Sequence, residues 1–378
     1  HNLYLRAMDY FSPEITFELL TEYESRREKV HKQFQPDFLK FLEEIRLFIR
    51  SAEHQHLFGT QQGDTILTQI STEELFKLEK RLTGSIIEYI QVQPLLRPSD
   101  PFLQLHGVIC DFASILRANN PAIIESFFDN GDDYGLRLTC ADASPYLKEI
   151  HQKCSGTVAF SATLKPFEFY RDLSGFDKEK LMCYEFPTPF PKENRRIFID
   201  PEVSTAFRDR VVYVQDIAQK ILQSFEKKLG NYIVFFPSFA FLQQMLPYLQ
   251  HRQFQIVAQH AEMSPEDRQG ITKEIQDTTR AKIILAVQGG IFSEGVDFPG
   301  DQLIGTAIIG PGLPAYTCER KALQKYYDQH YRAGQEYAYI YPAMCKVIQS
   351  AGRVIRTEQD KGIILLFDRR FLESKFVR

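Results

Sequence analysis

The first third of the chain has the hydrophobic spacing of amphipathic helices. Between Ser12 and about Asn119, apolar residues recur three and four positions apart, which places them on one face of a helix. Ser71-Thr72-Glu73-Glu74 has the spacing of a capping box, in which a hydroxyl and a carboxylate satisfy free amides of the first helical turn. Residues 54–68 contain two glycines and have the composition of a loop. We therefore predict an all-α region with one loop over 54–68 and a further helix over 101–116.

The pattern changes after Pro121. Residues 135–140 alternate between apolar and polar positions as a strand does, residues 145–151 have the spacing of a short helix, and the apolar run 156–160 predicts a buried strand. Three prolines then fall within residues 186–191. Proline removes a backbone donor and fixes φ, so this segment is predicted to be a linker.

Beyond the linker, apolar runs of strand length alternate with helical periodicity. Strands are predicted over 232–236, 254–258, 282–287, 301–309 and 362–367, and helices over 210–228, over 239–250 and from Ser264 onward, where Pro265 takes the first helical position. Such alternation predicts an α/β fold, with a parallel sheet and helices on both of its faces. Ligands of these sheets bind at the carboxyl ends of the strands.

Composition narrows the class of protein. The 378 residues are 44% hydrophobic, which excludes a disordered chain. The formal charge is −4, so any nucleic acid would have to bind in a local basic groove. The six cysteines form no Cys-x-x-Cys pair, so we expect reduced thiols and no metal site in this chain. No apolar run reaches the roughly 20 residues of a membrane span, and no secretory signal pattern is present, which favours a cytoplasmic location.

Hydroxyl residues follow two of the predicted strands. Ser161 and Thr163 come directly after 156–160, and Ser238 follows 232–236. Small hydroxyl side chains are common at helix starts, so each is, by itself, more typical of a cap than of a ligand contact. At the carboxyl end of a strand, the same groups can bind a phosphate or a sugar.

Two further segments have a stronger chemical signal. The loop after 282–287 has three glycines within eight residues and holds Ser293, Glu294 and Asp297, where backbone and carboxylates can approach a ligand closely. The segment Gln349-Ser-Ala-Gly352-Arg353-Val-Ile-Arg356 has two arginines three positions apart. On a helix their guanidinium groups would share a face, which suits the charge of a transferring γ-phosphoryl group. A solvated arginine pair is the structural alternative.

These residues, in this order, resemble the XPD/DinG-like superfamily 2 DNA helicases. Residues 161–164 resemble motif III, 232–238 motif IV, 293–298 motif V and 349–356 motif VI, and His1-Asn2 resembles the end of the Walker B box. The resemblance covers the whole chain and favours a piece of a longer protein. It implies four parts: a remnant of the first RecA-like domain (1–13), a helical Arch (14–130), a return to the first RecA-like domain (131–185) and a second RecA-like domain (186–378).

The resemblance also implies roles for single residues. Arg353 and Arg356 would be arginine fingers on the ATP γ-phosphate, with Gln349 beside them, and His1, Glu294, Asp297 and Gly352 would contact or sense the nucleotide. Ser161 and Thr163 would couple to His1, and Ser238 and Ser293 would contact the single-stranded DNA backbone. The Arch would close over the strand and would be the expected contact for repair proteins.

The missing segments limit what this chain does alone. It contains no Gly-x-x-x-x-Gly-Lys-Ser/Thr and no Walker B acids, so ATP and Mg²⁺ would be held mostly by an upstream ATP-binding half. The resemblance implies that a 4Fe-4S cluster, where the family has one, is ligated upstream as well. We expect the C-terminal part of an ATP-dependent, 5′ to 3′ DNA helicase of DNA repair, acting on single-stranded and on forked or tailed duplex DNA and inactive as an ATPase by itself.

Two alternatives remain open. The first is a non-catalytic single-stranded DNA-binding or scaffold protein whose Arch recruits a partner. The second is an unrelated α/β domain that binds a small ligand on the loop at Gly289.

Overall fold

The computed structural model describes residues 3–53, 56–62, 65–93, 95, 97–293 and 298–377. They divide into two compact units: the first contains residues 1–182 and 315–338, and the second contains residues 183–314 and 339–378. The predicted linker at 186–191 has no helix or strand, so that prediction is confirmed, and it lies close to the boundary between the units.

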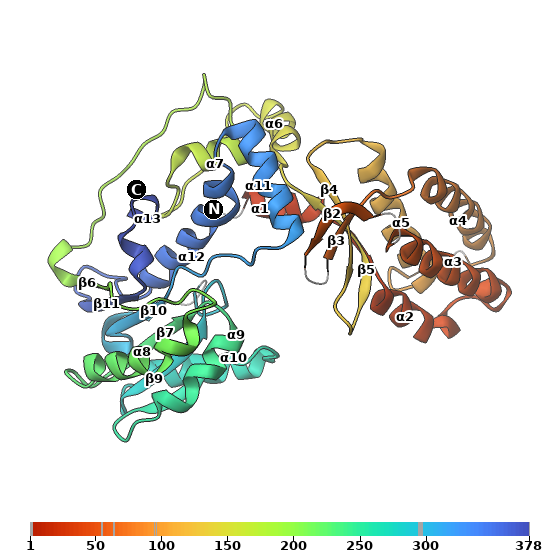
Figure 1. The fold of residues 1–378 in the computed structure, drawn as a ribbon. Coiled ribbons are helices and arrows are strands. Elements are labelled where there is room, and N and C mark those ends of the chain that lie inside the picture. Colours follow the sequence, from red (N-terminus) through yellow and green to blue (C-terminus); the bar gives the residue numbers. More distant parts are fainter. Residues whose placement is uncertain are drawn as a thin grey trace. The chain divides into compact units, whose positions relative to one another are not determined.

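The first unit is built on an antiparallel sheet of order β1-β5-β4-β3-β2 (Figure 1). Its strands are β1 (Glu14–Thr16), β2 (His56–Gln62), β3 (Thr65–Thr68), β4 (Ile123–Asp129) and β5 (Tyr134–Cys140). Helices α2 (Phe17–Ser25), α3 (Gln35–Glu53), α4 (Thr72–Val92) and α5 (Pro101–Arg117) share one hydrophobic core with Phe127, Leu136 and Leu138 of the sheet. The predicted helices are therefore confirmed, with apolar faces that pack as their spacing requires. The capping box predicted at Ser71 was wrong, because Ser71 is the N-cap of α4 but its side chain makes no capping hydrogen bond.

The prediction of an all-α region was wrong in one respect, because three strands lie within it. β1 has only three residues and pairs with β5, more than 100 positions later. β2 and β3 occupy the predicted loop and pair with each other, and β3 continues onto β4. Short strands of this kind are stabilised by distant partners and leave too few residues for a local alternation signal.

Helix α11 (Cys318–Tyr331) belongs to this first unit, although it comes late in the sequence. Glu319 accepts a hydrogen bond from Ser126 Oγ of β4 at 2.7 Å, and the Cys318 thiol donates to the Thr65 carbonyl of β3 at 3.3 Å. Ser126 alternates with the core residue Phe127 along β4, so α11 covers the sheet face opposite to α2–α5. The first unit also holds α1 (Leu3–Tyr10), α6 (Ser144–Gln152) and α7 (Phe167–Leu173).

The strand predicted over residues 156–160 of the first unit is absent. Residues 156–160 have no strand, and the side chains of Val158 and Phe160 are 86% and 87% exposed. No strand among the described residues pairs with them, and an apolar run forms a buried strand only where neighbouring strands cover it. The predicted domain boundary at residue 130 stays a prediction, and the β4–β5 hairpin runs across it.

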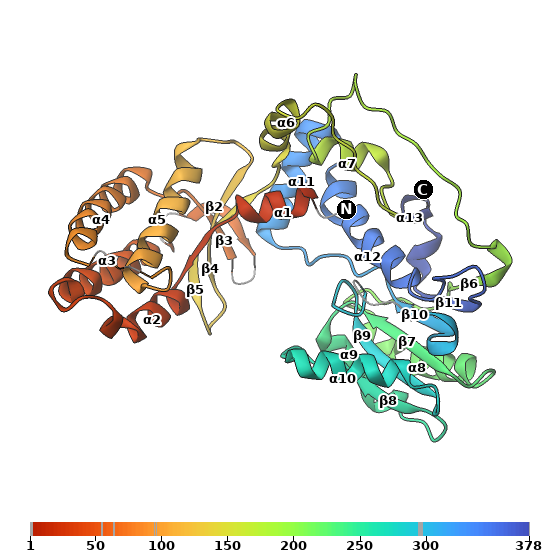
Figure 2. The same ribbon diagram turned by 180° about the vertical axis from the view of Figure 1, so that it is seen from behind.

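The second unit has the predicted parallel sheet, of order β6-β11-β10-β7-β9-β8 (Figure 2). All five strand pairs are parallel. Its strands are β6 (Arg195–Asp200), β7 (Asn231–Phe236), β8 (Gln255–Ala258), β9 (Lys282–Val287), β10 (Gly305–Ile309) and β11 (Gly362–Phe367). Its helices are α8 (Arg210–Phe225), α9 (Phe239–Met245), α10 (Pro265–Gln276), α12 (Tyr341–Ala351) and α13 (Ser374–Val377). A π-helical segment, Glu336–Ile340, lies between α11 and α12 in the sequence and includes the boundary between the units.

Helices cover both faces of this sheet, as the α/β prediction requires. Val234 and Phe236 of β7 pack with α8 and α9 in one hydrophobic cluster, and Ile233 and Phe235 pack with α10 and α12 in another. The helix predicted from Ser264 is α10, and it begins with a capping box of Ser264 and Asp267 that was not predicted. β6 was not predicted because it is an edge strand whose residues are mostly charged or exposed. Its pairing with β11 is decided by tertiary structure.

Asp100 is a buried residue that caps helix α5, and its substitution tests the stability of the helical core of the first unit. Its carboxylate accepts hydrogen bonds from the Phe102 and Leu103 amides at the start of α5 and from the Tyr89 hydroxyl of α4 at 2.7 Å. We expect Asp100→Ala to lower the free energy of unfolding by about 2 kcal/mol, because it removes a helix cap and leaves a buried tyrosine hydroxyl unsatisfied. Urea unfolding followed by circular dichroism measures this, with the exposed Asp111→Ala as matched control. Equal midpoints for both variants would contradict it.

Candidate functional site

Two predicted site residues follow neighbouring parallel strands of the second unit. Ser238 lies two positions after β7, where its Oγ accepts a hydrogen bond from the Phe241 amide at 3.3 Å and caps α9. The capping alternative is therefore confirmed, and a DNA contact by Ser238 stays a prediction. Ser293 follows β9 and is fully buried. Its Oγ accepts from the Gly289 amide at 3.2 Å and lies 3.4 Å from Ser350 Oγ, so it fixes the glycine loop against α12.

Arg353 and Arg356 do not share a helix face, contrary to the prediction. Helix α12 ends at Ala351, and Gly352 is its C-cap, with an amide that donates to Ile348 O at 2.9 Å. Both arginines therefore lie in the segment between α12 and β11. Arg353 is buried and Arg356 is half-buried, while Gln349 is half-buried on the last turn of α12.

A buried carboxylate holds the segment that follows the helix. Asp360 accepts hydrogen bonds from the amides of Arg356 at 2.7 Å and Thr357 at 2.8 Å, and from the Thr357 hydroxyl at 2.7 Å. It also accepts from the Gly300 amide, which precedes β10. A local side chain that binds backbone amides competes with helical hydrogen bonds. The turn that presents Arg356 is thus held at the side of the sheet where β10 and β11 begin.

The remaining predicted residues fall elsewhere. Ser161 and Thr163 belong to the first unit, where their hydroxyl oxygens are 3.3 Å apart in an exposed turn. His1, Glu294 and Asp297 lie outside the described residues. Motifs IV, V and VI are therefore gathered in one unit, and motif III is in the other.

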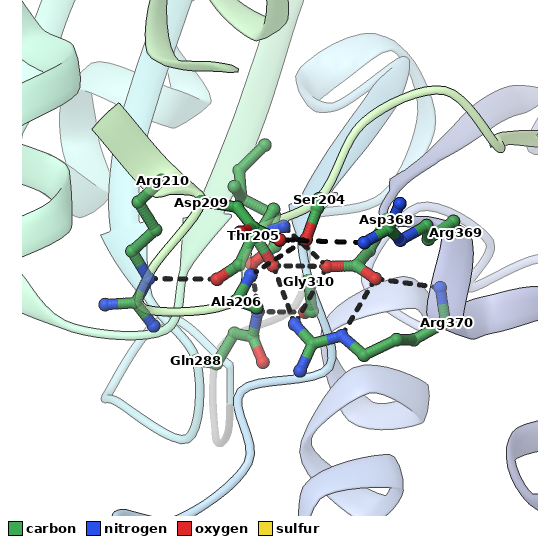
Figure 3. Close-up of polar contacts among 11 residues, drawn as sticks. Ser204, Thr205, Ala206, Asp209, Arg210, Gln288, Gly310, Asp368, Arg369 and Arg370 are labelled. Carbon is green, nitrogen blue, oxygen red and sulfur yellow. Dashed lines mark hydrogen bonds and ion pairs between the residues drawn. The ribbon is translucent and has the colours of Figure 1, made fainter. Parts of the chain in front are cut away.

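At the opposite ends of the same strands, a polar cluster surrounds Asp368 (Figure 3). Asp368 follows β11, is fully buried, and accepts hydrogen bonds from Thr205 N at 2.8 Å and Thr205 Oγ1 at 2.6 Å. Arg370 binds both carboxylate oxygens, with its Nε at 2.9 Å and an Nη at 2.8 Å. Burial raises the pKa of the Asp368 carboxyl, but these donors outweigh it, so the net pKa lies below the ordinary value.

Gly310 makes this close approach feasible. It follows β10 with φ of +72°, and a Cβ there would lie 1.9 Å from Thr205 Oγ1. Only glycine adopts this backbone without strain and leaves the room that the threonine needs. The loop 203–209 is consequently fastened to the carboxyl ends of β10 and β11.

Sequence reasoning missed this cluster. Thr205, Asp368 and Arg370 are distant in sequence and belong to no motif that the pattern indicated. The available signal was a polar run, Asp368-Arg-Arg370, directly after an apolar strand. Gln288, directly after β9, was also missed: it is buried and donates to Gly310 O at 2.9 Å, and its Oε1 has no hydrogen-bond partner within the described part of the chain.

The described residues also bear on metal binding and on membrane insertion. Among those residues, no group of three or more His, Cys, Asp or Glu side chains could hold a metal ion. Nor does any helix described there have the length and apolar character to cross a bilayer.

Comparison with known proteins shows which helicases this chain is similar to. Residues 221–378 match the helicase C-terminal domain. The XPD helicase subunit of the general transcription and DNA repair factor IIH of Dictyostelium discoideum is 26% identical over 335 residues, 82% of this chain and 42% of that protein. The ATP-dependent DNA helicase DinG of Photobacterium profundum is 25% identical over 267 residues, 67% of this chain and 37% of that protein. Residues 221–378 are therefore a helicase C-terminal domain, and the chain is similar to the XPD and DinG helicases.

The fold of the chain is also similar to that of a solved helicase structure. A solved structure of XPD in its apo form matches with a TM-score of 0.65 over 100% of this chain and 72% of that chain, at 18% identity. The chain spans about a third to two fifths of the length of the curated relatives it matches.

The lowered pKa of Asp368 predicts how the stability of this region depends on pH. Its pKa is lower in the folded state, so its stabilisation is present above the unfolded value of about 3.9 and is lost as the pH falls through the folded pKa. We expect Asp368→Asn to lower the free energy of unfolding by about 2–3 kcal/mol at pH 7, because Arg370 loses its buried partner. The deficit narrows below about pH 4. Chemical unfolding at pH 7 and pH 3.5 measures it; an equal deficit at both would contradict the assignment.

Proposed function

We propose that this chain is the C-terminal half of an ATP-dependent DNA helicase. In the whole protein, ATP hydrolysis would drive translocation on single-stranded DNA and duplex unwinding, in the 5′ to 3′ sense. The observation that carries the proposal is the meeting of motifs V and VI on one parallel sheet: Ser293 contacts Ser350 of α12, and Asp360 presents the Arg356 turn. A relative named as an ATP-dependent DNA helicase, DinG of Photobacterium profundum, supports it.

The two arginines supply the chemistry proposed for this half. A guanidinium group is a planar cation that binds phosphate oxygens with two donors. Arg353 and Arg356 would reach the γ-phosphate of ATP held by an upstream half, and Gln349 and Gly352 would adjoin it. ATP and Mg²⁺ would be bound mostly by that upstream half, together with any 4Fe-4S cluster, and Arg353 and Arg356 would stabilise the charge that develops during phosphoryl transfer.

The proposed partners follow from the same arrangement. Single-stranded DNA would cross the Ser238 side of the second unit, and forked or tailed duplexes would be unwound. The helical core around α2–α5 would serve as the Arch and as the contact for repair proteins. The proposed location is cytoplasmic, where thiols stay reduced.

The first test is a DNA-stimulated ATPase assay. The chain alone should be inactive because it contains no Walker A segment, whereas the chain joined to an upstream ATP-binding half should hydrolyse ATP faster when single-stranded DNA is added. Inactivity of the joined protein that still binds ATP would overturn the proposal and favour the scaffold alternative.

The second test addresses the finger assignment. In the joined protein, Arg356→Ala should lower ATP hydrolysis by on the order of 10³-fold and abolish unwinding. Binding of a fluorescent ATP analogue should persist, because the upstream half holds most of the nucleotide. Arg356→Lys should recover little, since a single ammonium lacks the guanidinium geometry, and the exposed Arg280→Ala is the matched control. Normal unwinding by Arg356→Ala would remove Arg356 from the mechanism.

A further inference from the structure

An exposed aromatic ring stands at the carboxyl edge of the second sheet. Phe207 lies in the turn between β6 and α8, and its side chain is 85% exposed. The turn itself is held firmly, because Thr205 is bound to Asp368 and Ser204 Oγ donates to Asp209 at 2.5 Å. Phe207 is therefore presented to solvent by a fixed loop.

Arg210 joins this ring to the motif IV loop. Its guanidinium carbon lies 5.7 Å from the centre of the Phe207 ring and 4.9 Å from that of Phe241, and its Nε donates to Thr205 O at 3.0 Å. The Phe241 amide in turn donates to Ser238 Oγ. Contacts through the buried Phe241 thus connect Phe207 and Arg210 to the predicted DNA contact Ser238.

The charge at this surface is positive. Arg210 has no ion pair within the described part of the chain, because the adjacent Asp209 carboxylate lies 3.6 Å from Arg369 instead. Arg208 beside it is exposed. Burial and then the Arg370 charge lower the pKa of the Arg210 guanidinium. Arg370 is itself paired with Asp368, so the uncompensated positive charge at this surface comes from Arg210 and Arg208.

We propose that Phe207 and Arg210 bind one nucleotide of single-stranded DNA, with its base stacked on the Phe207 ring and its phosphate on the Arg210 guanidinium. Aromatic rings beside cations are the combination by which proteins hold single strands without reading sequence. The inference rests on the proposed function and adds the residues that hold the strand beyond Ser238. An apolar protein partner could also cover Phe207, but the uncompensated cation favours a polyanion.

Fluorescence anisotropy with a labelled single-stranded oligonucleotide tests the proposal on the chain itself. Phe207→Ala should weaken binding about tenfold, which is within the range of one stacked base, and Phe207→Tyr should retain it. Arg210→Gln should weaken binding and reduce the salt slope by about 0.7, the value of one phosphate contact on a single strand. Phe198→Ala is the matched aromatic control, because Phe198 is 53% exposed on edge strand β6, and Arg252→Gln is the charge control, since Arg252 is exposed before β8.

An abasic oligonucleotide separates the two contacts. Phe207→Ala should bind it as tightly as the unchanged chain does, whereas Arg210→Gln should still lose affinity. Unchanged affinity of Phe207→Ala for the normal strand, with the unchanged chain binding well, would overturn this inference and leave the proposed function standing. Failure of the unchanged chain to bind any single strand would overturn both.

Discussion

Strand β11 carries a buried carboxylate at each end, and the geometry of the second unit's loops depends on this pair. Asp360 precedes the strand and Asp368 follows it, and both are almost wholly shielded from solvent. A buried carboxylate is tolerated only when hydrogen-bond donors replace the lost water. Asp360 therefore gathers the Gly300, Arg356 and Thr357 amides, and Asp368 gathers Thr205 and Arg370. Each aspartate fixes a loop that has no regular structure of its own.

The two loops have different proposed tasks. At the start of β11, Asp360 sets the turn that presents Arg356 toward the proposed nucleotide site. At the end of β11, Asp368 sets the turn that presents Phe207 and Arg210 toward the proposed DNA strand. A parallel strand with neighbours on both sides is among the most rigid elements of a fold, so both groups are mounted on one stiff support. The lowered pKa of both aspartates has the same origin, donors that outweigh burial.

The first unit shows why a helical pattern can conceal strands. Its helices bury a continuous apolar face, for example Phe38, Leu42, Ile45 and Ile49 on α3, and this periodicity was legible in the sequence. β1 and β3 have three and four residues, and their pairing partners come from β4 and β5 far along the chain. Helix α11 also packs on this sheet, although it lies nearly 200 residues after β4, the strand that it contacts.

The sequence by itself determined the parallel sheet, the helices on both of its faces and the order of the motifs, because period and motif order are local properties of the chain. The tertiary structure alone decided where the turn at Arg356 lies, because Asp360 holds its amides and also accepts from the Gly300 amide. It also decided that residues 156–160 form no strand, that Ser293 is buried, and that Thr205 meets Asp368. These outcomes depend on which distant groups meet, and hydrogen-bond donors for a buried charge cannot be assigned from neighbours in sequence.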